Sequence, residues 1–168
     1  MITIPIVGKA GTVPENVLAA AKNIYVNHKD KFVLRSREPY LDICYLQESE
    51  GTNWLINDTD ANIIKDFVNS IFSSAFETRI HAWLGESDLH DYHHPYPRVF
   101  IPVTNDGCVY RIQTKNNQNY SMQFKLGNYY VWDVRERHFV TNSKPLINRL
   151  VILFQFDPNK ETIYKGTQ

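Results

Sequence analysis

Residues 127–156, GNYYVWDVRERHFVTNSKPLINRLVILFQF, contain two apolar strand patterns and several polar residues placed at their ends. The first apolar stretch leads into Asp133 and then His138, and the second opens with Arg149. Histidine can supply a neutral imidazole, and arginine is an obligate cation. Brought together at one end of a β-sheet, these two side chains suit the binding of a metal next to a carboxylate ligand.

The rest of the second half also reads as β-structure. From residue 79 onward, strand patterns of five to eight residues are separated by turn-forming residues at 85–87, 95–97, 105–107, 116–119, 127–128 and 142–145. Many short strands with such punctuation indicate a sandwich or a small barrel. We therefore predict a mainly β fold, a double-stranded β-helix of the jelly-roll or cupin-like type, whose mouth is a natural ligand pocket.

The first half predicts two helices that support this barrel. Thr12 could cap a helix with Pro14 in its first turn, followed by apolar residues on one face. Asp58 or Thr59 could cap a second helix that ends before Glu77. Residues 41–46 and 54–56 resemble the two strands of a hairpin. We expect one domain over residues 1–168, with 1–78 as support and 79–157 as the barrel core.

Composition limits the classes of partner. Lys and Arg together number 18, equal to Asp and Glu, so no net charge attracts nucleic acid or an anionic membrane. Cys44 and Cys108 are too few for a disulfide framework, and no signal-like segment opens the chain. The apolar run 150–154 is too short to span a bilayer. These features predict a soluble cytoplasmic protein, and nothing in the sequence indicates its oligomeric state.

The histidines are clustered. Four of the six lie between His81 and His94, including those of the segment LHDYHHPYP at 89–97. Two histidines and a carboxylate on one face leave coordination positions open, which is the arrangement of non-heme Fe(II) sites. If this segment is a strand, His90 shares a face with Tyr92 or Asp88, and Asp91 shares one with His93. His81 alternates with apolar residues, so it is either a core residue or a contact to substrate.

Two arginines precede apolar strands. Arg149 precedes residues 150–154 and Arg98 precedes residues 99–103. A guanidinium held by such a strand can grip a carboxylate with two hydrogen bonds, as a dicarboxylate cosubstrate would require. The sequence contains no phosphate-binding Gly-rich loop, no Gly-x-Ser-x-Gly and no Cys-x-x-Cys, which argues against nucleotide hydrolases, esterases and zinc ribbons.

About half of the chain, from Arg79 to Asp157, resembles the aspartyl/asparaginyl hydroxylase-like branch of the Fe(II) and 2-oxoglutarate-dependent oxygenases, which includes the proline cis-4-hydroxylases. The matching residues are Gly127, Asp133, His138, Asn142, Arg149 and Phe156-Asp157 downstream, and His90-Asp91-Tyr92 with residues 98–108 upstream. The resemblance implies that His138 and His90 bind iron, with Asp91 as a third ligand. It also implies that Arg149 holds the distal carboxylate of 2-oxoglutarate and that Arg98 is a second anion contact.

The chain departs from the family pattern at two places. His90 and Asp91 are adjacent, whereas the family normally has one residue between these ligands, and some members use two histidines without a carboxylate. Phe100 stands where the family often has a histidine that contacts 2-oxoglutarate. Catalysis is accordingly expected to depend on His90, His138 and Arg149, with hydroxylation of an amino acid, a peptide side chain or a related small molecule as the outcome.

Two alternatives stay open at the level of the sequence. In the first, the cluster of His81, His90, His93 and His94 supplies three metal ligands together with His138, giving a metal cupin that acts as a dioxygenase or isomerase without 2-oxoglutarate. In the second, the barrel is a non-catalytic binding module whose metal site has degenerated, because one fold can serve many functions. Failure to bind any divalent metal would favour the non-catalytic module. Metal binding or activity that is independent of 2-oxoglutarate would favour the metal cupin over the oxygenase.

Overall fold

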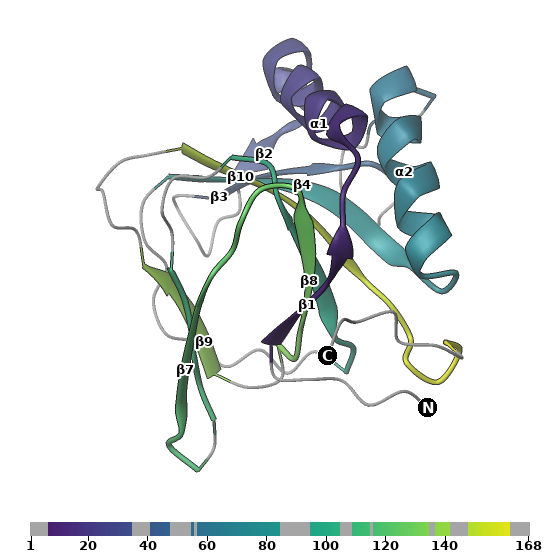
Figure 1. Ribbon diagram of the computed structural model, residues 1–168. Helices are drawn as coiled ribbons and strands as arrows, with labels where there is room; N and C mark the ends of the chain where they lie inside the picture. The colour runs from purple at the N-terminus through teal and green to yellow at the C-terminus, as the bar shows by residue number, and fades with distance from the viewer. Residues whose placement is uncertain are drawn as a thin grey trace.

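Two antiparallel sheets and two helices form the described part of the chain, which comprises residues 7–34, 41–47, 55, 57–84, 95–104, 109–114, 116–134, 137–141 and 148–161 of a computed structural model (Figure 1). The helices are α1 (Glu15–Asn27) and α2 (Thr59–Ile71), with a short 3-10 turn, η1 (Lys29–Lys31). The strands are β1 (Val7–Thr12), β2 (Val33–Leu34), β3 (Leu41–Tyr45), β4 (Phe76–Leu84), β5 (Arg98–Pro102), β6 (Val109–Gln113), β7 (Asn119–Gln123), β8 (Asn128–Trp132), β9 (Arg137–Thr141) and β10 (Asn148–Gln155).

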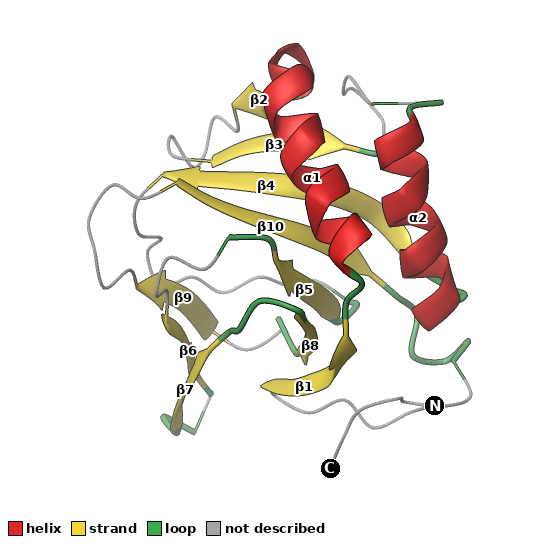
Figure 2. Cartoon of the chain, turned by 45° about the horizontal axis from the view of Figure 1, so that its top comes forward, coloured by secondary structure: helices red, strands yellow, loops and turns green. Residues whose placement is uncertain are grey.

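The strands form a large sheet and a small one. The large sheet has the order β1-β8-β5-β10-β4-β3-β2, and the small sheet has the order β7-β6-β9. Both helices cover the outer face of the large sheet, and its inner face is turned toward the small sheet (Figure 2). This arrangement confirms the predicted double-stranded β-helix with two supporting helices. The subdivision into a supporting and a core segment stays a prediction.

Strand β10 shows how one sequence builds both faces of the large sheet. Leu150, Ile152 and Phe154 belong to the apolar cluster on the helix side. The alternate residues Val151 and Leu153 belong to a second cluster, between the sheets. This is the period of two that a strand requires. The long apolar run therefore supplies two different cores at once.

Helix α2 begins where the sequence predicts. Asp58 is its N-cap, and its side-chain Oδ1 accepts a hydrogen bond of 2.9 Å from the backbone N–H of Ala61. The other oxygen, Oδ2, lies 3.1 Å from Nε2 of His28, the residue that ends α1. Asp58 thus links the ends of the two helices that cover the large sheet.

Helix α1 begins later than predicted. Its N-cap is Pro14 rather than Thr12, and no side chain caps it. Thr12 instead closes β1, where it pairs with Asn128 of β8. The expectation that Thr12 caps the helix was wrong, because the chain stays with the sheet through Val13, whose N–H donates to the carbonyl of Gly127, and the helix begins only at Glu15. Strand β1 itself was not predicted, since VGKAGT has little apolar alternation.

The predicted strand at 41–46 corresponds to β3, which pairs with β2 and β4. Of the second predicted strand, 54–56, only Leu55 lies within the described residues. Its backbone N–H donates to the carbonyl of Tyr45 at 2.9 Å. Among the described residues, no helix is both long and apolar enough to cross a membrane.

Candidate functional site

Strand β4 presents polar side chains to the space between the sheets. Ile80 and Ala82 belong to the apolar cluster on the helix side. Arg79, His81 and Trp83 alternate with them and therefore project from the inner face. Arg79 and His81 are almost fully buried, at 4% and 2% exposure. Two titratable or charged side chains are therefore held in the interior of the barrel.

Arg149 projects from the same inner face, one strand away. It is the register partner of Trp83, and its side chain is 2% exposed. Its guanidinium carbon lies 4.9 Å from the ring centroid of Trp83 and 5.6 Å from that of Tyr110. Trp83 belongs to the large sheet and Tyr110 to the small one, so the cation lies between the two sheets. Contacts with aromatic faces stabilise a buried guanidinium while leaving its N–H groups in the plane for hydrogen bonds.

The backbone around Arg149 is fixed by a neighbouring loop. The N–H of Leu150 donates to the hydroxyl of Thr104 at 2.9 Å, and the carbonyl of Leu150 accepts from the N–H of Val103, also at 2.9 Å. These bonds tie the start of β10 to the end of β5. Arg149 therefore projects from a rigid position, as a ligand-binding residue requires.

Arg79 and His81 are joined by a hydrogen bond. Nε–H of Arg79 donates to Nε2 of His81 at 2.9 Å. The same arginine bonds Glu77 through Nη1 at 3.0 Å, and Glu77 also accepts a hydrogen bond from the side-chain amide of Gln155. Glu77 therefore accepts hydrogen bonds from both Arg79 and Gln155. Arg79 in turn donates to His81, the next inward-facing residue of β4 before Trp83.

Aromatic rings fill much of the remaining space between the sheets. Tyr110 stacks on Phe124 with centroids 4.0 Å apart, and Phe124 stacks on Tyr130 at 4.1 Å. Phe100 packs against Trp132 at 4.7 Å. These rings exclude water from the inner face, so a charge placed there interacts with its partners more strongly than it would in water.

The predicted iron ligands are only partly described. Residues 85–94, which include His90, Asp91, His93 and His94, lie outside the described residues. His138 is on β9, and its backbone is paired with Ile112 of β6, a residue of the cluster between the sheets. Within the described ranges, no three His, Cys, Asp or Glu side chains are grouped as a metal site would need. The assignment of His90, Asp91 and His138 to iron stays a prediction.

Arg98 is also buried, at 5% exposure, but it lies far from Arg149. Its register partner on β10 is Gln155, six residues beyond Arg149, which corresponds to about 20 Å along a strand. The structure thus brings Arg149 together with Trp83, Tyr110 and His81, and it does not bring Arg98 to the same point.

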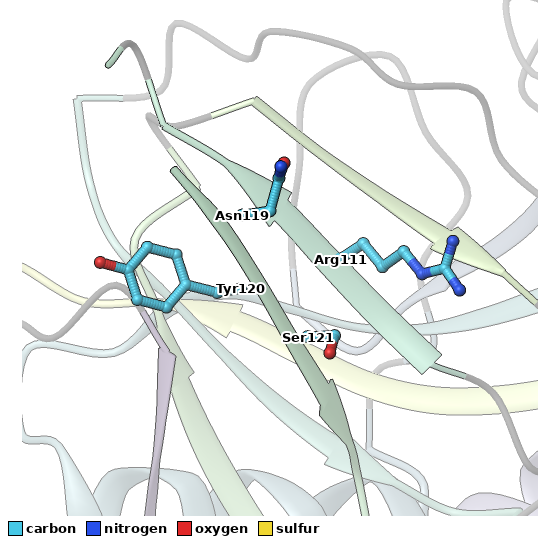
Figure 3. A pocket seen from close by; sticks show the side chains of 4 residues that line it. All are labelled: Arg111, Asn119, Tyr120 and Ser121. Atoms are coloured by element: carbon cyan, nitrogen blue, oxygen red, sulfur yellow. The ribbon is translucent and has the colours of Figure 1, made fainter. Parts of the chain in front are cut away.

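A shallow depression of about 380 Å³ lies on the small sheet, lined by Arg111, Asn119, Tyr120 and Ser121 (Figure 3). All four residues are exposed. Arg111 and Tyr120 project in opposite directions from their strands, as Figure 3 shows. Because its polar groups do not converge, this depression is a poorer candidate than the space around Arg149.

Two contributors to the site were not singled out from the sequence. The sequence indicates only that Arg79 belongs to a strand, and it indicates no role for Tyr110. The alternation Arg79-x-His81-x-Trp83 was a usable signal for the first, because three polar or amphipathic residues share one face of an otherwise apolar strand. Tyr110 had no such signal, since its contact with Arg149 depends on how the two sheets face each other.

The described surroundings of Arg149 suit a carboxylate ligand. A guanidinium that is desolvated, held over aromatic faces and fixed at the start of a strand can form two parallel hydrogen bonds with a carboxylate. For a metal, the described residues supply one candidate position, His138, on the sheet that faces Arg149. Arginine is the side-chain type expected to bind the carboxylate of the predicted cosubstrate, and histidine is the type expected to bind the predicted metal.

Comparison with solved structures finds the same fold in two prolyl hydroxylases and an epimerase. A prolyl-4-hydroxylase from Pseudomonas putida is 15% identical, with 90% of this chain and 91% of that chain covered and a TM-score of 0.56. A prolyl hydroxylase from Trichoplax adhaerens, solved with a hypoxia inducible factor peptide, is 13% identical, with 86% and 78% covered and a TM-score of 0.59. The α-ketoglutarate-dependent epimerase SnoN of nogalamycin biosynthesis is 10% identical, with 94% and 82% covered and a TM-score of 0.60.

At these identities the likeness establishes the fold alone. No protein-family profile matches the chain, and no curated protein sequence matches it.

Proposed function

We propose that this chain is a non-heme Fe(II) and 2-oxoglutarate-dependent dioxygenase that hydroxylates an amino acid, a peptide side chain or a related small molecule. The observation that carries the proposal is Arg149, a guanidinium 2% exposed and held over Trp83 and Tyr110 between the two sheets. The fold shared with 2-oxoglutarate-dependent enzymes supports it. The residues around His138 and Arg149 favour the aspartyl/asparaginyl hydroxylase-like branch.

Arg149 is the residue that would hold the distal carboxylate of 2-oxoglutarate. Its planar fork can donate two hydrogen bonds to the two carboxylate oxygens. The aromatic contacts fix the plane of the fork and keep water away, so the ion pair gains strength from its surroundings. The rigid start of β10 sets the orientation of the cosubstrate relative to β9, the strand that carries His138.

His138, His90 and Asp91 are the residues that would hold iron. Two imidazoles and a carboxylate occupy one face of the metal and leave the other positions open. With 2-oxoglutarate and oxygen, such an iron centre supplies the oxidising power for hydroxylation of a C–H bond. The protein contributes orientation and a dry interior, the latter from the aromatic rings that line the inner face.

The substrate belongs to the class of amino acids and peptides on two grounds. The matching branch includes free-proline hydroxylases, and a structure with the same fold was solved with a peptide fragment. Arg98 is about 20 Å along β10 from Arg149, so we do not expect it to contact the carboxylate that Arg149 holds.

The test is an anaerobic titration of the metal-free protein with Fe(II) and then with 2-oxoglutarate, followed by the visible charge-transfer band of the chelate. We expect a band that is lost in His138→Ala and that requires far more 2-oxoglutarate in Arg149→Gln. Arg111→Gln is the matched control, because Arg111 is an exposed arginine of β6 outside the proposed site. Circular dichroism confirms that each variant is folded.

The outcomes separate the proposal from its alternatives. A band that depends on both residues supports the oxygenase and justifies screening amino acids and peptides for succinate release. Metal binding with no effect of 2-oxoglutarate favours a cupin that does not use this cosubstrate. Folded protein that binds no divalent metal favours a non-catalytic module.

A further inference from the structure

His81 has no role in the function proposed above, yet it is 2% exposed on the inner face of β4. Its register partner on β10 is Val151, two residues after Arg149, and its ring centroid lies 5.9 Å from that of Trp83. Trp83 in turn lies under the guanidinium of Arg149. His81 and Arg149 are therefore neighbours of the same aromatic ring.

The hydrogen bond from Arg79 decides the protonation of His81. Arginine carries only donors and is always charged, so Nε2 of His81 must present a lone pair to Nε–H of Arg79, 2.9 Å away. A neutral imidazole that accepts at Nε2 carries its proton on Nδ1. Protonation of both nitrogens would break this bond and place a second cation beside Arg79, and Arg149 adds a further positive charge on the neighbouring strand.

The orientation of Arg79 is itself fixed. Its Nη1 donates to Glu77 at 3.0 Å, and its guanidinium carbon lies 5.8 Å from the ring centroid of Tyr45 on β3. Glu77 is held in addition by the side chain of Gln155. Among the described residues, Arg79 contacts His81 directly, Glu77 and Tyr45 lie beyond Arg79, and Arg149 is on the neighbouring strand.

We propose that Arg79 is a positioning residue that locks His81 as the neutral Nδ1–H tautomer, and that this N–H is a further donor to the ligand bound by Arg149. The second part rests on the proposed function. A neutral donor beside a guanidinium adds a directional hydrogen bond to an oxygen of the ligand without adding charge to the interior. His81 would thus contribute to the recognition of 2-oxoglutarate, whereas Arg79 acts through His81.

The tautomer is measured first, on the wild-type protein without any ligand. In protein labelled with 15N-histidine, two-bond proton–nitrogen correlations distinguish protonated from bare ring nitrogens. We expect His81 to show a bare Nε2, which accepts from Arg79, and a protonated Nδ1. In Arg79→Met, where Nε2 loses its donor, the resonances of His81 should change to a mixture of the two neutral tautomers. A protonated Nε2 in the wild type overturns the lock.

The donor is tested by a matched pair of substitutions. The amide nitrogen of Asn reaches the position of Nδ1, whereas that of Gln reaches the position of Nε2. We expect His81→Asn to keep wild-type affinity for 2-oxoglutarate in the anaerobic Fe(II) titration, and His81→Gln and Arg79→Met to weaken it about tenfold, the scale of one hydrogen bond to a charged group. Equal affinity in all three folded variants overturns the donor role.

The 2-oxoglutarate titrations distinguish a wrong role for His81 from a wrong function for the whole protein. If 2-oxoglutarate binds in an Arg149-dependent way and the His81 variants bind it normally, the dioxygenase proposal stands and the donor role is wrong. If the wild-type protein binds no 2-oxoglutarate, the proposed function fails and the donor role fails with it. The nuclear magnetic resonance measurement decides the tautomer lock in either case.

Discussion

The two faces of the large sheet are built by the same strands and both carry an apolar cluster, but they differ in the polar side chains that they bury. On the outer face, Ile80, Ile152 and Phe154 pack with residues of α1 and α2 in one apolar cluster. On the inner face, five polar or charged side chains are buried, namely Arg79, His81, Arg98, Arg149 and Gln155. Burial of apolar groups stabilises a fold, whereas burial of charged groups costs several kcal/mol unless they are well paired. The outer face therefore packs through its apolar cluster, whereas the inner face also buries charged and polar side chains and carries the proposed ligand site.

The largest effect on stability is expected on the outer face. Ile152 is fully buried in the centre of the helix-covered cluster. Ile152→Ala should lower the free energy of unfolding by about 2–5 kcal/mol, because it removes apolar contacts and leaves a cavity. Urea denaturation followed by circular dichroism measures the change. The affinity of the remaining folded protein for 2-oxoglutarate should be unchanged, and a large loss of affinity would show that the two faces are not separable.

The largest effect on binding is expected on the inner face. Arg149→Gln should weaken 2-oxoglutarate about 100-fold, because the buried carboxylate loses its cationic partner. Arg149→Lys should fall between this variant and the wild type, since lysine keeps the charge but not the planar fork. Calorimetric titration under anaerobic conditions measures both affinities. Wild-type affinity in Arg149→Gln would refute the assignment of this residue.

A smaller effect on stability is expected where the helix layer is joined. Asp58 caps α2 through the N–H of Ala61 and lies 3.1 Å from His28. Asp58→Ala should lower the free energy of unfolding by about 1 kcal/mol, the usual value for loss of an N-cap side chain. Asp58→Asn is the control, because asparagine caps a helix nearly as well and removes only the negative charge near His28. If both variants lose the same stability, the charge rather than the cap is responsible.

The smallest change is expected in the chemical reactivity of Cys44, a residue of β3 that is buried in the apolar cluster on the helix side. Desolvation by burial raises the pKa of its thiol to about 12, with Lys31 lowering it slightly. Native protein should therefore show no alkylation of Cys44 near pH 8, because the thiolate is the reactive form. Peptide mass spectrometry after treatment with iodoacetamide distinguishes this cysteine from Cys108, and rapid labelling of Cys44 would contradict its burial.

The same pKa shift has a consequence for stability. The unfolded chain loses the Cys44 proton near pH 9, whereas the folded protein keeps it until about pH 12. Between these values the folded state binds more protons, so stability falls as pH rises. A Cys44→Ala variant should lose this part of the alkaline destabilisation, which can be measured by urea denaturation at increasing pH.

Much of the fold could be predicted because it depends on local patterns. The period-two alternation and turn residues after residue 79 predicted the strands, and Asp58 was predicted as a cap that the structure confirms. The predicted start of α1, with Thr12 as its cap, was wrong because Thr12 pairs with Asn128, a partner more than a hundred residues away. Local sequence does not contain that information.

The sequence by itself determined that Arg149 opens a buried strand, that His138 lies on the strand before it, and that polar residues alternate with apolar ones on β4. Only the tertiary structure decided their neighbours. The packing of the two sheets puts Tyr110 beside Arg149, and the register of β10 keeps Arg98 about 20 Å along the strand from it. Side-chain geometry then joins Arg79 to His81. Strand periodicity fixes which face a residue occupies, whereas contacts between strands depend on register and on the packing of sheets.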